Sequence, residues 1–393
     1  MFARILSLVT LAAVANAYWT FGGTPVLVQT RLDSIVNPDS IGTHVHAITG
    51  ASGFSNHYDY DQLVQSNCTT ITVQADKSNY WMPQMYHRDK DTGAFQAMPT
   101  EFNIYYLPRV GPKNESIKAF PKGFRSHVAY PIQAFNGGDC PDSHPVHLMS
   151  LFYEMGVAVN QFDFHGNGTW VLANGDTTGF GLHADFQNGW DVDLLQQAID
   201  QCSGQSGNLA DCAPLVAASD PAAAAACVFQ GDLVDEPTGV NAPIPALPGC
   251  NPVFGSGQDT SSCANKPTPG LVSAQPPLPL GWTEIGCIAE GTSGRALPAL
   301  TMSAPNMTKE ACAAFCASHN FTLAGAEFSD ECYCDNALKN GASGTLLPWT
   351  ECANRCAGNS FEICGGGAKL TLMAHRASAH PARRASRFER ERA

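Results

Sequence analysis

Eight of the fifteen cysteines lie in one short segment, between Cys287 and Cys364. A segment of this size buries too little apolar surface to fold securely on its core alone, so cysteines at this density normally form disulfides. Zinc is the alternative partner, but zinc sites rarely use eight cysteines in a secreted setting. We therefore predict a small disulfide-rich α+β domain at 281–375, and the sequence does not decide the pairing among Cys287, Cys312, Cys316, Cys332, Cys334, Cys352, Cys356 and Cys364.

The first seventeen residues predict export. Arg4 is followed by an apolar run over 5–14 and by the small-x-small cleavage pattern Ala15-Asn-Ala17. The run is too short for a stable membrane anchor. We therefore predict a signal peptide at 1–17 and a secreted protein, extracellular or in a cell wall, with glycosylation sequons at Asn67, Asn114, Asn167, Asn306 and Asn320.

Charge and hydropathy narrow the class of partner. The net charge of −13 argues against binding to nucleic acid. No long apolar stretch follows the cysteine-rich segment, so we expect no membrane partner. We also predict that the protein is a monomer. The last residues, 376–393, are rich in arginine and almost free of apolar side chains, which predicts a basic, disordered tail. Its Arg383-Arg384 pair is typical of processing sites.

The chain before the cysteine-rich segment predicts a larger, mostly β domain at 18–255. Short alternating runs such as 102–107 and 158–164 are separated by Gly, Pro and Asn, which is typical of an antiparallel sandwich or jelly-roll-like fold with few helices. Three- and four-residue spacing of apolar side chains predicts one helix at 191–202, and a run of alanines suggests another at 222–226. Pro and Gly then predict a linker at 256–280.

The cysteine-rich segment also carries a recognisable order of motifs, among them Gly281-Trp282, Glu331-Cys-Tyr-Cys334 and Cys364-Gly-Gly366. It resembles a WSC domain, a small secreted module associated with binding fungal cell-wall glycans. The resemblance implies a cell-wall polysaccharide partner, such as a β-glucan. The candidate sugar-contacting aromatic residues in it are Trp282, Phe328, Tyr333 and Trp349, and each of them could instead be a core residue.

The larger domain resembles the fungal secreted "domain of unknown function 1996" family, which often precedes a WSC domain. The blocks that carry the resemblance include Thr43-His44-Val-His46, Gly181-Leu-His183-Ala-Asp185 and Leu247-Pro-Gly-Cys250-Asn251. It implies no established activity. This chain departs from the family pattern at a shortened junction, 120–127, which a deletion or an error in the gene structure would explain. Seven cysteines remain outside the WSC-like segment, so one thiol is expected to be unpaired.

Histidines are the candidate chemical groups of the larger domain. His44 and His46 are two residues apart, a spacing that puts both rings on one face of a strand, and His183 and Asp185 repeat it. Imidazoles in this pattern suit a divalent metal such as zinc or copper, and imidazole with carboxylate also suits proton transfer. His127 and His144 are further candidates. The alternative is that these histidines only hydrogen-bond loop backbones.

A second candidate feature is Lys77 with Tyr80 and Trp81, because pyranose rings stack on aromatic side chains. The alternative is that both aromatic residues belong to the core. Two functions follow. In the first, the protein binds structural polysaccharide without catalysis; in the second, it is a polysaccharide-active enzyme with a histidine-centred site. Histidines scattered over the surface favour the first, and three or more in one cleft favour the second.

Overall fold

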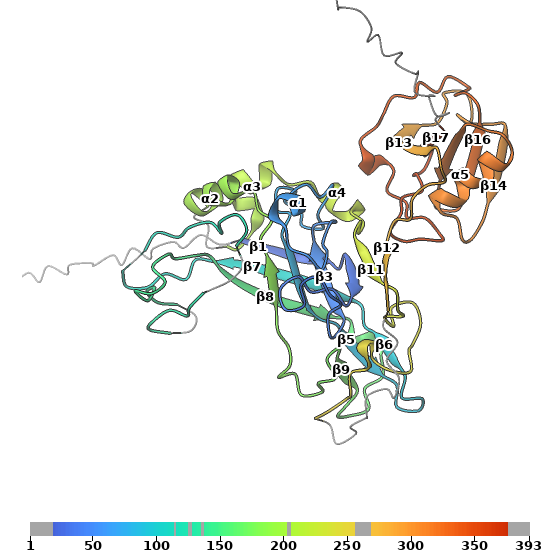
Figure 1. Ribbon diagram of the computed structural model, residues 1–393. Coiled ribbons are helices and arrows are strands. Elements are labelled where there is room, and N and C mark those ends of the chain that lie inside the picture. Colours follow the sequence, from blue (N-terminus) through green and yellow to red (C-terminus); the bar gives the residue numbers. More distant parts are fainter. Residues whose placement is uncertain are drawn as a thin grey trace, which may run out of the picture. The chain divides into compact units, whose positions relative to one another are not determined.

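The protein is described by a computed structural model that covers residues 19–113, 115–124, 128–134, 137–202, 206–255 and 269–375. The predicted signal peptide, Asn114, His127 and the basic tail lie outside these described residues. The chain divides into two compact units, Met1–Ser273 and Ala274–Ala393 (Figure 1). As expected from the sequence, both are built mainly from antiparallel strands with few helices.

The described residues of the large unit form four sheets, and the strand pairs of each are antiparallel. One has the order β1 (Trp19–Pro25), β7 (Thr100–Leu107) and β8 (Ser150–Val157). The second has the order β10 (Asp185–Gln187), β4 (Asn79–Pro83), β3 (His46–Gly50) and β2 (Val28–Thr30). The two smaller sheets consist of β6 (Phe95–Ala97), β5 (Met85–Arg88) and β9 (Trp170–Leu172), and of β11 (Asp232–Val234) with β12 (Leu271–Ser273). Strand β12 thus occupies part of the predicted linker.

The main core of the large unit joins side chains of the first two sheets. Phe102, Ile104 and Tyr106 alternate along β7, and they share one buried cluster with Tyr80 and Met82 of β4. This alternation is the period-two pattern that predicted strands here. A hydrogen-bond chain crosses the same core, from Trp190 Nε1 to the Tyr106 hydroxyl (2.7 Å), from there to the Tyr80 hydroxyl (2.5 Å), and on to Asp76 Oδ2 (2.5 Å).

Helices in the large unit are short. The predicted helix is confirmed as α2 (Val192–Gln201), which begins after Asp191 because that carboxylate accepts hydrogen bonds from the first-turn N–H groups. The other helices are α1 (Tyr60–Leu63), α3 (Ala213–Ala217) and α4 (Pro221–Ala226), with 3-10 turns at Val159–Gln161, Leu209–Asp211 and Pro248–Cys250. The strand predicted at 158–164 is wrong, because β8 ends at Val157 and a 3-10 turn follows.

The small unit is a five-stranded sheet with one helix. Its order is β13 (Trp282–Ala289), β17 (Lys369–His375), β15 (Leu323–Glu327), β16 (Glu331–Asp335) and β14 (Leu300–Ser303). Helix α5 (Lys309–Ser318) packs on this sheet (Figure 1), and a 3-10 turn covers Trp349–Glu351. The predicted disulfides are confirmed as Cys287–Cys352, Cys312–Cys332, Cys316–Cys334 and Cys356–Cys364. The paired sulfurs leave no zinc site among these cysteines.

Disulfides also support the large unit, where Cys68 pairs with Cys227 and Cys202 with Cys212, while Cys250 is disulfide-bonded too. Cys140 is the free cysteine of the described residues, in agreement with the odd count. Across the described part of the chain, no helix has the length and apolar character needed to cross a membrane.

Candidate metal centre

Three histidines meet at one end of the strands of the β10-β4-β3-β2 sheet. His46 begins β3 and Asp185 begins β10, and both strands run antiparallel to the intervening β4. The first residues of β3 and β10 therefore lie at the same end of the sheet. There His46 pairs with Pro83, and Asp185 pairs with Trp81. His44 and His183 each stand two residues further back along the chain. The sheet order thus brings together two histidine blocks that are far apart in sequence.

The three imidazoles are close enough to share a metal ion. His44 Nε2 lies 3.3 Å from His183 Nε2, and the ring centroids of His44 and His46 are 4.4 Å apart. One ring nitrogen from each histidine lies within 4.8 Å of the corresponding atoms of the other two. The site is graded in burial, with His46 fully buried, His44 half-buried and His183 exposed. A bound ion would therefore be reached from the His183 side.

Hydrogen bonds determine which ring nitrogen points toward the centre. His46 Nδ1 donates to the Leu32 carbonyl (3.0 Å), and His183 Nδ1 donates to the Gly181 carbonyl (2.9 Å). A carbonyl only accepts, so the Nε2 atom of each neutral ring carries a lone pair. His46 Nε2 is buried and has no hydrogen-bond partner. This is the arrangement of metal-binding histidines, whose second nitrogen is usually held by a carbonyl or carboxylate.

His44 completes the set with a more adaptable hydrogen bond. Its Nδ1 lies 2.9 Å from the Thr43 hydroxyl, which can either donate or accept. With the hydroxyl accepting, Nε2 of His44 presents a third lone pair to the centre. With the hydroxyl donating, His44 Nε2–H instead donates to His183 Nε2 at 3.3 Å. Without an ion, His44 and His183 are therefore hydrogen-bonded to each other, whereas His46 Nε2 has no partner. Moving one proton on His44 turns its Nε2 lone pair toward an ion.

The environment keeps His44 and His46 neutral, which metal binding requires. Burial, followed by the neighbouring His183, lowers the pKa of His44 from 6.5 to about 4. Burial and His44 lower the pKa of His46 from 6.5 to about 3. Both rings are thus uncharged over the whole pH range in which most secreted proteins work.

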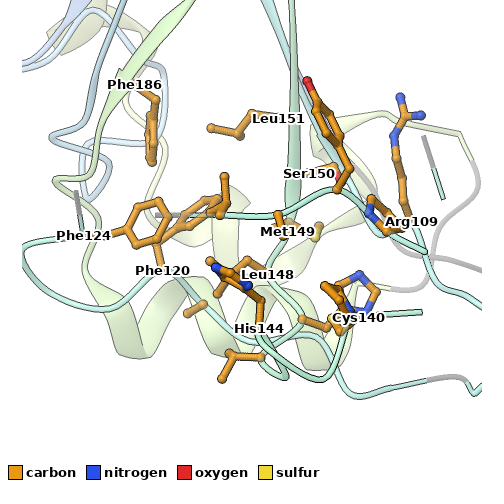
Figure 2. Close-up of a pocket in the computed structure, with 18 of the residues that line it drawn as sticks. Arg109, Phe120, Phe124, Cys140, His144, Leu148, Met149, Ser150, Leu151 and Phe186 are labelled. Atoms are coloured by element: carbon orange, nitrogen blue, oxygen red, sulfur yellow. The ribbon is translucent and has the colours of Figure 1, made fainter. Parts of the chain in front are cut away.

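Asp185 connects the histidines to a large cavity. Its Oδ2 lies 3.9 Å from His183 Nε2, and burial raises the pKa of Asp185 from 3.8 to about 6. The same residue lines a cavity of about 1140 Å³. Figure 2 shows Phe120, Phe124 and Phe186 gathered at one side of this cavity and Cys140 at the other. Asp185 is thus the residue through which the cavity adjoins the histidine cluster.

Two residues that were not predicted to belong to the site, Arg31 and Asn251, hold the loop that carries His44. Buried Arg31 forms a bidentate ion pair with Glu236 (2.5 and 2.9 Å) and donates from Nη1 to the Gly42 carbonyl (2.8 Å). Asn251 Nδ2 donates to the Thr43 carbonyl at 2.9 Å. Asn251 belongs to the family-like block at 247–251, so that motif marked it, but only the fold connects Asn251 and Arg31 with His44.

Other sequence candidates lie elsewhere. Tyr80 and Trp81 are completely buried, so neither ring offers a face to a sugar, and the sugar-stacking platform predicted at these residues is wrong. The reason is that both belong to β4, which is buried along its whole length, while Lys77 before it is half-buried. His144 lines the cavity but is not part of the histidine cluster.

The aromatic candidates of the small unit also divide by exposure. Trp282 and Tyr333 are buried, and the Arg295 guanidinium lies 4.4 Å from the centre of the Tyr333 ring, so sugar stacking predicted on them is wrong. Trp349, with 43% exposure, keeps an accessible ring. Phe328, with 59% exposure, is a second accessible aromatic residue. The sequons at Asn67, Asn167, Asn306 and Asn320 all have exposed asparagines.

Comparison with known proteins agrees with this division of the chain. The family described as "Domain of unknown function (DUF1996)" matches residues 33–126 and 125–190, and the WSC domain matches 284–366. A WSC domain-containing protein of Arthroderma benhamiae is 34% identical over 118 residues, 30% of this chain and 12% of that protein. A "putative fungistatic metabolite" of Chaetomium globosum is 38% identical over 89 residues, 22% of this chain and 39% of that protein.

A human relative, Kremen protein 2, is 30% identical over 86 residues, 22% of this chain and 18% of that protein. The matches thus span well under half of the length of these relatives. Similarity to WSC proteins indicates a carbohydrate-binding or cell-surface role. The chain carries a DUF1996 domain in its N-terminal region and a WSC domain at 284–366.

Proposed function

We propose that this protein is a secreted, polysaccharide-active enzyme with a three-histidine metal centre, held on a structural polysaccharide by its WSC domain. The observation that carries the proposal is the convergence of His44, His46 and His183, with two Nε2 lone pairs already directed by backbone carbonyls. This convergence favours an enzyme over simple glycan binding, for which the histidines would be scattered over the surface.

The side chains present suit a zinc or copper ion. Imidazole nitrogens bind both ions, and three protein ligands leave a coordination position open for water or substrate. Such an ion lowers the pKa of bound water and polarises substrate oxygens. His46 forms the buried floor of the site and His183 its exposed side, so substrate approaches past His183.

Asp185 is the candidate proton-transfer group. Its pKa of about 6 is close to the pH at which a carboxylate accepts and returns protons most effectively. Its position at the wall of the 1140 Å³ cavity places that proton transfer beside a bound polymer. The half-buried apolar side chains Phe124 and Phe186 in the same cavity can cover sugar C–H faces.

Metal binding is the first test. Purified protein is stripped with a chelator, dialysed against zinc or copper, and analysed for metal content. We expect His44→Ala, His46→Ala and His183→Ala each to bind one ion fewer than the wild type. The matched control is His57→Ala, because His57 is exposed and pairs with Asp39 away from the cluster. Wild-type content in all three cluster variants would refute the metal centre.

Activity is the second test. Product release from β-glucan, chitin, xylan and cellulose is measured with the metal-loaded protein. We expect Asp185→Asn to keep its metal but to lose most of the product release, and His46→Ala to lose both. Metal loading without any turnover on these polymers would support glycan binding as the function of the chain.

Retention on polysaccharide tests the WSC part of the proposal. The compact unit 274–375, with its disulfides formed, should be retained on at least one insoluble cell-wall polysaccharide. Complete recovery in the supernatant for β-glucan, chitin, xylan and cellulose would contradict this part of the proposal, whatever the result for the metal centre.

A further inference from the structure

A second cluster of ligand-type side chains lies at the wall of the same cavity. It consists of Glu115, Cys140 and His147, and one ligand atom from each lies within 4.8 Å of the other two. Cys140 and His147 both line the cavity. None of the three belongs to the histidine cluster described above.

Hydrogen bonds join the two chain segments that form this cluster, 113–118 and 139–147. Cys140 N–H donates to Glu115 Oε2 at 2.9 Å, and Lys118 N–H donates to the His147 carbonyl at 2.8 Å. Asp139 adds a third link, because its Oδ1 accepts from Lys113 N–H at 2.8 Å. The backbone around the three side chains is therefore held by several hydrogen bonds, as a preformed site requires.

His147 provides an independent indication that a ligand belongs here. The residue is only 8% exposed, and its Nδ1 is buried without a hydrogen-bond partner. A buried polar atom left unpaired destabilises a protein, so such atoms normally have a partner or a ligand. Coordination of a metal ion would satisfy a ring nitrogen of His147 next to a thiol and a carboxylate.

Cys140 is the free cysteine of the described residues. Every other cysteine of the described residues is disulfide-bonded. The Cys140 thiol therefore lies beside two further ligand groups without a cysteine of the described residues to pair with.

We propose that Glu115, Cys140 and His147 form a second metal site, for zinc or a similar borderline divalent cation. Sulfur, nitrogen and oxygen ligands in this number match zinc, with water from the cavity in the fourth position. On binding, the Cys140 sulfur exchanges its proton for the ion, so one proton is released and no electron is transferred. The site stands apart from the proposed histidine centre and does not depend on it.

Cobalt(II) distinguishes the two centres in the intact protein. A thiolate bound to cobalt gives a sulfur-to-metal charge-transfer band in the near ultraviolet, and the histidine cluster has no sulfur to produce one. We expect this band in the wild type and in His46→Ala, and we expect it to be absent in Cys140→Ser. Cobalt-loaded wild type without the band would overturn the second site and leave the histidine centre unaffected.

Thiol protection tests the site without any substitution. Cys140 of the chelator-treated wild type should react with iodoacetamide, and one equivalent of zinc beyond the histidine centre should slow the reaction. Glu115→Gln should weaken zinc protection more than about tenfold, since even groups that only support a metal ligand contribute that much. His144→Ala is the matched control, because His144 lines the same cavity outside the cluster. Equal labelling with and without zinc, or a disulfide-linked dimer on a non-reducing gel, would refute the proposal.

Discussion

Replacement of Asp76 by asparagine should change how the stability of the large unit depends on pH. Asp76 is completely buried, where Tyr80 and the Ser78 backbone N–H donate to its carboxylate. Burial outweighs these hydrogen bonds and raises the pKa of Asp76 from 3.8 to about 6. Folding therefore favours the protonated acid, and the ionised form is destabilising.

The size and sign of the effect follow from that pKa. Below about pH 4 the carboxyl is protonated in the folded and the unfolded chain, so it causes no penalty. As the pH rises from about 4 to 6, the unfolded chain ionises first, and the free energy of unfolding falls. At about 1.4 kcal/mol for each tenfold change in the ionisation equilibrium, the total loss is about 3 kcal/mol above pH 6.

Urea denaturation of the wild type and Asp76→Asn, followed by tryptophan fluorescence between pH 4 and 7.5, measures this difference. A chelator in every sample excludes effects of metal binding. We expect the stability of the wild type relative to Asp76→Asn to fall by about 2.5 kcal/mol over this range, because part of the unfolded chains is already ionised at pH 4. Asp163→Asn, a substitution at an exposed carboxylate, is the control and should show no such trend. Parallel stability curves for the wild type and Asp76→Asn would refute the buried, protonated carboxyl.

Three further substitutions or treatments test the described contacts. Glu236→Gln should cost about 3–5 kcal/mol in chemical denaturation and weaken metal binding in calorimetry, because it leaves the buried Arg31 guanidinium without its carboxylate partner. Trp349→Ala should lower retention on polysaccharide in pull-down assays, whereas Tyr333→Phe should leave it unchanged. The reason is that, of these two rings, the Trp349 ring is accessible and the Tyr333 ring is buried. Reduction of the excised 274–375 unit should unfold it by circular dichroism and abolish retention, since each lost disulfide typically costs about 2–5 kcal/mol.

Local patterns predicted much of the architecture. The density of cysteines between Cys287 and Cys364 identified a disulfide-held domain, because a segment this small has no other sufficient source of stability. Helix α2 followed from apolar spacing, a signal that lies within one segment. The same patterns failed at 158–164, where alternation alone did not show that β8 ends at Val157.

The candidate site required long-range information. His44 and His183 are 139 residues apart, and only the order of β10, β4 and β3 brings their Nε2 atoms within 3.3 Å. The hydrogen bonds that direct the lone pairs of His46 and His183 come from backbone carbonyls, which no side-chain motif reveals. Burial was equally hidden, because β4 is covered on both faces and its aromatic side chains do not alternate with polar ones. The residues themselves determined which chemistry was available, and strand pairing between distant segments decided which of them meet.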